Sequence, residues 1–125
     1  MKEQTVRQKR FLSTNLAGTT FNGRQETLKE LSKKRAFYKL VRDKDNEYDK
    51  YAVKVVAIDS NKKEHDVGFL PRNKNLEIAY ALDQEENCYI RSYRFIGGYN
   101  NKNYGLVVNI NYNIRANQRR EKWMN

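Results

Sequence analysis

Two apolar runs that flank a polar loop constrain the fold of this chain more than any other feature. The runs cover residues 37–41 and 52–58, and the loop between them covers residues 43–50. Both runs are rich in the β-branched and aromatic residues that favour strands. The sequence therefore predicts two strands joined by a loop that they hold in place, which is a frequent position for functional residues.

The most regular pattern in the chain lies in residues 104–114. Its apolar residues fall on one face of an extended chain and its asparagines on the other, which is typical of a half-buried strand. The apolar set is Leu106, Val108, Ile110, Tyr112 and Ile114, and the polar set is Asn109, Asn111 and Asn113.

Three further strands and two short helices complete the prediction. Strands are expected over residues 11–21, 65–70 and 88–96, with turn residues between them. Leu28 and Leu31 give one buried stripe to a helix over residues 24–34, and a second helix is expected from residue 73 to residues 82–84. Its inward residues are expected to be Leu76, Ala79 and Leu82.

These elements indicate a mainly β protein with two short helices, and a small β-barrel with helical insertions suits them. A chain of 125 residues is expected to form one domain. Residues 1–10 are interpreted as a basic N-terminal arm, residues 11–114 as the domain, and residues 115–125 as a basic C-terminal tail.

The formal net charge of +10 indicates a polyanionic partner. The chain has 25 basic and 15 acidic residues, and part of the excess lies in its two ends. Charge of this sign attracts nucleic acid, the commonest polyanion. The alternative interpretation is solubility with two charged, frayed tails.

Several other classes of protein are not supported. A single cysteine, Cys88, excludes an internal disulfide framework. No apolar run approaches the roughly 20 residues that span a bilayer, and residues 1–10 lack the apolar core of a signal peptide, so a cytoplasmic protein is expected. The acids of residues 43–49 are spaced as in a calcium-binding loop, but Tyr48 and Lys54 stand where that loop needs glycine and glutamate. We therefore expect no metal, no cofactor and no enzymatic activity.

Three sequence blocks resemble the HIRAN domain family. They are Gly18-Thr19-Thr20-Phe21-x-Gly23-Arg24-Gln25, Asn46-x-Tyr48-Asp49-x-x-Ala52-Val53-Lys54-Val55 and Val67-Gly68-Phe69-Leu70-Pro71-Arg72. The resemblance extends from about residue 16 to residue 112, and in length the chain is similar to small standalone members from bacteria and phages. It implies an OB-like β-barrel with two helices, the HIRAN fold.

The resemblance also implies a ligand, because helicase-associated members bind single-stranded DNA and capture its free 3′ end. By this resemblance, Asp49 accepts a hydrogen bond from the terminal 3′-hydroxyl, and Tyr48 and Phe21 stack on bases. Arg72 holds a phosphate, and Asn46 either braces the loop or contacts the last nucleotide.

Three positions depart from the pattern of the best-understood members. Phe21 replaces a tyrosine, Thr20 replaces an arginine, and Glu47 replaces a proline and adds a charge that opposes phosphate. Tyr48 and Asp49 also have a purely structural interpretation, in which Asp49 caps the turn by accepting from backbone amides. These changes affect the expected affinity more than the expected fold.

The sequence thus predicts a non-catalytic module that binds single-stranded DNA and its free 3′-hydroxyl end. The expected site residues are Thr20, Phe21, Asn46, Tyr48, Asp49 and Arg72. The expected context is DNA repair, replication or a mobile element, with a helicase or nuclease as protein partner. The alternative is an adaptor that docks on such an enzyme without contacting nucleic acid.

Overall fold

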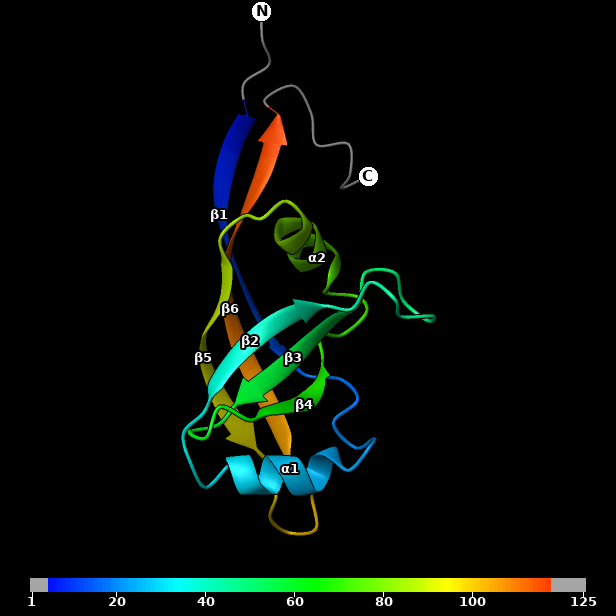
Figure 1. The fold of residues 1–125 in the computed structure, drawn as a ribbon, viewed down its shortest axis with the longest axis vertical. Coiled ribbons are helices and arrows are strands. Elements are labelled where there is room, and N and C mark those ends of the chain that lie inside the picture. The colour runs from blue at the N-terminus through cyan, green and yellow to red at the C-terminus, as the bar shows by residue number, and fades with distance from the viewer. Residues whose placement is uncertain (1–4, 118–125) are drawn as a thin grey trace, which may run out of the picture.

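The structure is a computed structural model that describes residues 5–117, and it is mainly β with two helices (Figure 1). The strands are β1 (Thr5–Asn15), β2 (Phe37–Arg42), β3 (Val53–Ile58), β4 (Glu64–Phe69), β5 (Cys88–Ile96) and β6 (Gly105–Asn117). The helices are α1 (Arg24–Leu31) and α2 (Leu76–Asp83). The predicted content of strands and helices is confirmed.

The strands form two three-stranded antiparallel sheets, in the orders β1-β6-β5 and β2-β3-β4. At one edge the sheets are joined by the pair Ala17 and Phe69, whose N–H groups donate to each other's carbonyl oxygens at 2.7 and 3.0 Å. No other pairing of strands joins the sheets within residues 5–117. The expected OB-like barrel is therefore not confirmed, and the observed fold is two linked sheets.

The core lies between the two sheets. All five apolar residues predicted to share one face of residues 104–114 are buried, so that prediction is confirmed. Aromatic side chains close the core where β2 faces β5, since the ring centroid of Tyr38 lies 4.3 Å from that of Tyr93. Full burial of an aliphatic side chain such as Leu106 or Ile110 stabilises a fold by roughly 1.5–3 kcal/mol.

Strand β1 differs from the prediction at both ends. It pairs with β6 from Thr5↔Asn117 to Asn15↔Val107, so residues 5–10 and 115–117 form a ladder rather than an arm and a tail. The paired ends run past α2 in Figure 1. Beyond Leu16 the chain turns at Gly18 (φ 72°), so the predicted strand over residues 11–21 ends early. The remaining arm and tail residues, 1–4 and 118–125, lie outside the described residues.

The helices confirm one predicted stripe fully and the other in part. Leu28 and Leu31 of α1 are buried as expected. In α2, Ala79 is buried and Leu82 is partly buried against the core, as expected, whereas Leu76 is 37% exposed. Ile78 and Ala81 are also buried. The helix begins at Leu76 rather than near residue 73, because residues 71–74 form a turn in which the Lys74 N–H donates to the Pro71 carbonyl.

Candidate functional site

The loop between β2 and β3 is shaped by the side chain of Asn46. Its Oδ1 accepts hydrogen bonds from the backbone N–H groups of Tyr48 and Asp49, both at 2.9 Å. Its Nδ2 donates to the Asp43 carboxylate at 3.2 Å. Asn46 therefore braces the loop, as expected of asparagine in a turn.

The Asp49 carboxylate is fixed by two donors. Its Oδ1 accepts from the Tyr51 N–H at 2.9 Å, and its Oδ2 accepts from Nδ2 of Asn75 at 2.7 Å. Asn75 is only 2% exposed, while Asp49 is half-buried. Each carboxylate oxygen has a second lone pair, so Asp49 can cap the turn and still accept a bond from a ligand.

Arg42 ties the far side of this loop to α2. Its Nη1 and Nη2 donate to the carbonyl oxygens of Ala52 and Lys50 at 2.8 and 3.1 Å. Its Nε donates to Oδ1 of Asp83 at 3.0 Å. The loop projects from the body of the protein in Figure 1, yet both of its ends are anchored by side chains as well as by the β2–β3 ladder.

A hollow of about 490 Å³ lies against this loop, and we call it the end hollow. Its lining residues are Asn46, Glu47, Tyr48, Asp49, Lys50, Tyr51 and Arg72. The hollow therefore brings together four of the six predicted site residues from two separate segments. The ring of Tyr48 is 82% exposed and available for stacking, and Arg72 is exposed as well.

Thr20 and Phe21 do not line the end hollow. They lie in the turn between β1 and α1, which projects on the same side of Figure 1 as the β2–β3 loop. Phe21 is 65% exposed, so it is not a core residue at a strand end. The Ala17–Phe69 bridge joins this turn to the end of β4, three residues before Arg72.

The other residues of the first sequence block hold this turn. Nη1 of the buried Arg24 donates to the Gly18 carbonyl at 2.8 Å, and its guanidinium lies 5.5 Å from the Phe69 ring centroid. Gln25 donates to the carbonyl oxygens of Thr19 and Tyr104, both at 2.9 Å. These residues therefore position Phe21 indirectly.

Three contributors were not predicted as site residues. Lys50 and Tyr51 line the end hollow, with the Lys50 ammonium 5.1 Å from the Tyr51 ring centroid. Their only sequence signal is adjacency to Tyr48 and Asp49. Asn75 carries no signal, because its role depends on the tertiary approach of residues 49 and 75.

The arrangement offers rings, one fixed carboxylate and cations, which suit a polar anionic ligand with flat groups. Within the described residues, no three His, Cys, Asp or Glu side chains gather as metal ligands would. Neither described helix is long and apolar enough to cross a membrane.

This fold and this hollow fit a small nucleic-acid-binding module, and comparison with known families identifies which one. The HIRAN domain family matches residues 9–112, so the chain belongs to the HIRAN family. HIRAN is a nucleic-acid-binding domain and is not catalytic by itself, which supports a DNA-binding role. No curated protein and no solved structure matches the chain.

Proposed function

We propose that this protein binds single-stranded DNA and receives its free 3′-hydroxyl end in the end hollow. The observation that carries this proposal is the shared lining of one concavity by the exposed Tyr48 ring, the fixed Asp49 carboxylate and Arg72. Membership of a nucleic-acid-binding family and the net charge of +10 support it.

A strand terminus offers a hydroxyl donor that an internal nucleotide lacks. Asp49 accepts this hydrogen bond and repels the phosphate of a continuing strand, and such a charge-assisted bond contributes roughly 1.5–3 kcal/mol. Tyr48 stacks on the terminal base, which contributes about 1–3 kcal/mol without regard to sequence. Arg72 pairs with the nearest phosphate.

Phe21 stacks on a further base outside the end hollow, and Thr20 lies beside it. The exposed Phe21 ring can stack, but it cannot donate the phenolic hydrogen bond that a tyrosine would add. We place the protein in DNA repair, replication or a mobile element, alongside a helicase or nuclease that handles the same strand.

The test is fluorescence anisotropy with one oligodeoxythymidine that ends in either a 3′-hydroxyl or a 3′-phosphate. The wild-type protein should prefer the hydroxyl roughly tenfold or more. Asp49→Asn removes the charge and keeps an oxygen acceptor for the Tyr51 N–H, and a flip of the Asn75 amide restores the second side-chain hydrogen bond of position 49. The variant should therefore abolish the preference. Asp45→Asn makes the same change at an exposed position of the loop and is the control.

Equal affinity of the wild-type protein for both ends would remove end recognition and leave general strand binding. Absence of binding to either oligonucleotide at physiological salt would overturn the proposal altogether. That result would favour the alternative, an adaptor that docks on a helicase or nuclease.

A further inference from the structure

The outer face of the β1-β6-β5 sheet is open to solvent and has a regular cross-strand order. The register aligns Phe11, Asn111 and Tyr89 in one row across the three strands. The next row is Ser13, Asn109 and Ser92, and Lys9 pairs with Asn113 on the other side. We call this surface the sheet face.

The sheet face has a strongly positive charge. None of its three strands contains an aspartate or a glutamate. Their basic residues are Arg7, Lys9, Arg10, Arg91, Arg94 and Arg115. The Glu86 carboxylate pairs with Arg7 and Arg115 at one end, and Arg10, on the opposite face of the sheet, pairs with Glu77. Within residues 5–117, Lys9, Arg91 and Arg94 form no ion pair.

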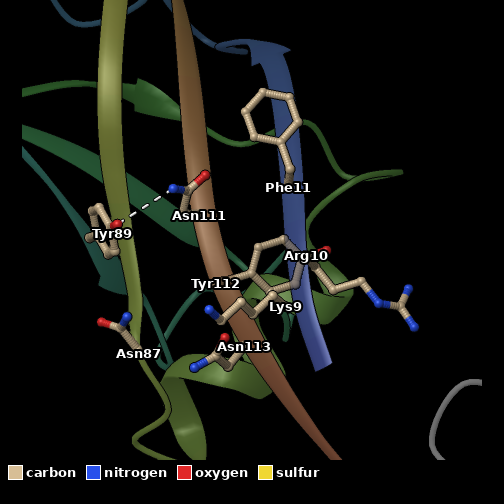
Figure 2. Close-up of a pocket in the computed structure, with 8 residues that line it drawn as sticks. All are labelled: Lys9, Arg10, Phe11, Asn87, Tyr89, Asn111, Tyr112 and Asn113. Carbon is tan, nitrogen blue, oxygen red and sulfur yellow. Dashed lines mark hydrogen bonds between the residues drawn. The ribbon is translucent and has the colours of Figure 1, made fainter. Parts of the chain in front are cut away.

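Two exposed rings lie in the central row. Phe11 is 55% exposed and Tyr89 is 45% exposed, and they stand on either side of Asn111 (Figure 2). Asn111 Nδ2 donates to the Tyr89 hydroxyl at 3.4 Å. The Arg91 guanidinium lies 5.5 Å from the Phe11 ring centroid. Single exposed apolar residues need no explanation, but two rings in one row beside cations form a stacking surface.

The sheet face is hollowed rather than flat. A depression of about 420 Å³ is lined by Lys9, Phe11 and Tyr89 together with the asparagines between them (Figure 2). The amides of Asn111 and Asn113 line the same depression and can both donate and accept hydrogen bonds at base edges.

A second depression leads from the sheet face toward the end hollow. It measures about 510 Å³, and it is lined on one side by Ser13, Asn15 and Arg94 of the sheet. Its other side is lined by residues 71, 73 and 74, which flank Arg72 of the end hollow. Lys74 and Arg94 thus place cations on a path between the two surfaces.

We propose that the sheet face is a second binding surface for single-stranded DNA. Internal bases stack on Phe11 and Tyr89, and the Asn111 amide contacts base edges. Lys9, Arg91 and Arg94 contact the phosphates, which explains why these strands contain no acid. The strand enters from the end hollow past Lys74, and this direction alone rests on the function proposed above; the stacking surface does not depend on it.

The test compares a 4-nucleotide and a 20-nucleotide oligodeoxythymidine, both with a 3′-hydroxyl, by fluorescence anisotropy. The 20-mer should bind more tightly to the wild-type protein. Phe11→Ala with Tyr89→Ala should weaken binding of the 20-mer by about tenfold or more and leave the 4-mer unchanged. The matched control is Phe37→Ala with Tyr99→Ala, which removes two rings that are each 64% exposed elsewhere.

The variant Phe11→Tyr with Tyr89→Phe keeps both rings and should bind the 20-mer as the wild-type protein does. Weaker binding by this variant as well would indicate a folding defect rather than lost stacking. Equal affinity of the wild-type protein for both lengths would overturn the proposal. Unchanged 20-mer binding by the double alanine variant would also overturn it. That result would favour an acidic protein as the partner of the sheet face. A 20-mer with a 3′-phosphate separates the two proposals. If end recognition fails, binding of this 20-mer should still be weakened by loss of the Phe11 and Tyr89 rings.

Discussion

At the residue scale, the structural role of Asp49 is compatible with the binding role proposed for it. Its carboxylate caps the turn through the Tyr51 N–H and contacts Asn75, as the structural interpretation expected. The same bonds fix its orientation before a ligand arrives. Preorganisation of this kind reduces the entropy lost on binding.

Asn75→Ala should therefore affect both the fold and the loop. The change removes a 2.7 Å hydrogen bond to a carboxylate from a side chain that is 2% exposed. Loss of such a bond costs about 1–3 kcal/mol, which urea denaturation can measure. Hydrogen exchange should also become faster at the amides of residues 48–51. Asn73→Ala, at an exposed position two residues earlier, is the control, and an equal loss in both variants would contradict this role.

Glu47→Gln should raise the affinity for single-stranded DNA. Glu47 lines the end hollow, and its charge opposes the phosphate that Arg72 is proposed to hold. Removal of one exposed charge changes such interactions by about 0.2–1 kcal/mol, so a gain of about 1.4- to fivefold is expected by anisotropy. Glu30→Gln removes an exposed charge from α1 and should give no comparable gain. A weaker complex after Glu47→Gln would show that the carboxylate contacts the ligand favourably.

At the element scale, the close approach of β4 to residues 16–19 joins the two sheets. Gly68 has φ 151°, and a Cβ at this position would lie 2.7 Å from the Ala17 carbonyl oxygen. The Ala17–Phe69 bridge thus requires glycine beside it, because backbone atoms cannot yield as a flexible side chain can.

Gly68→Ala should lower the free energy of unfolding by about 2 kcal/mol or more, as measured by urea denaturation. Gly23→Ala is the matched control, since Gly23 also has positive φ (73°) but a Cβ there meets nothing within 4 Å. The control should lose only the strain of the left-handed conformation, about 1–2 kcal/mol. A smaller loss for Gly68→Ala than for Gly23→Ala would mean that the sheets separate readily.

The Glu86 carboxylate joins the paired ends of β1 and β6 through ion pairs with Arg7 and Arg115. Hydrogen bonds from Arg7 and then from Arg115 lower the pKa of Glu86 below its usual value of 4.5, against the effect of burial. Because the folded state favours the ionised form, this contribution to stability is present above that value and is lost as the pH falls through the folded pKa.

Glu86→Gln should accordingly destabilise the protein at pH 7, and the difference from the wild-type protein should shrink below about pH 4.5. Thermal unfolding across this pH range measures it. Glu85→Gln removes the neighbouring exposed charge and serves as the control. A difference that stays constant with pH would show that Glu86 acts through packing rather than charge.

The sequence was sufficient to predict a strand where buried and exposed residues alternate. It was insufficient where only hydrogen bonding to a neighbouring strand makes a segment a strand. Residues 108–114 alternate between buried and partly exposed positions because one face is buried, so that strand could be predicted. Residues 5–10 are polar and basic, and only their ladder with β6 makes them a strand. In α2 only Leu76 was wrongly expected to face the core, because it lies in the first turn and is exposed, whereas Ile78 is buried.

The candidate site could also be predicted only in part from the sequence. Asn46, Tyr48 and Asp49 lie in one loop, so their grouping could be predicted from the sequence. Their grouping with Arg72 was expected only from the resemblance to the HIRAN family. The separation of Phe21 from the end hollow and the contact of Asn75 with Asp49 depend on how the sheets and α2 pack. The sequence has no local signal for such contacts.

At the scale of the whole molecule, the excess positive charge is distributed unevenly. The β1-β6-β5 sheet carries basic side chains and no acids, whereas the β2–β3 loop that lines the end hollow mixes both signs. A surface without acids attracts phosphates without selecting among them, whereas a hollow with both signs of charge suits the proposed discrimination between a hydroxyl and a phosphate. This division suits a protein that holds a strand along one surface and recognises its end at another.

If phosphates contact the sheet face, its lysines and arginines should govern the salt dependence of binding. Each phosphate contact with a single strand contributes about 0.7 to the slope of log Kd against log salt concentration. Lys9→Gln with Arg94→Gln should therefore reduce the slope for a 20-nucleotide oligodeoxythymidine by about 1.4, measured by anisotropy at several salt concentrations. Lys33→Gln with Lys34→Gln makes the same change in charge near the end of α1 and should leave the slope nearly unchanged. Equal reductions in both pairs would mean that DNA responds to the net charge of +10 and not to the sheet face.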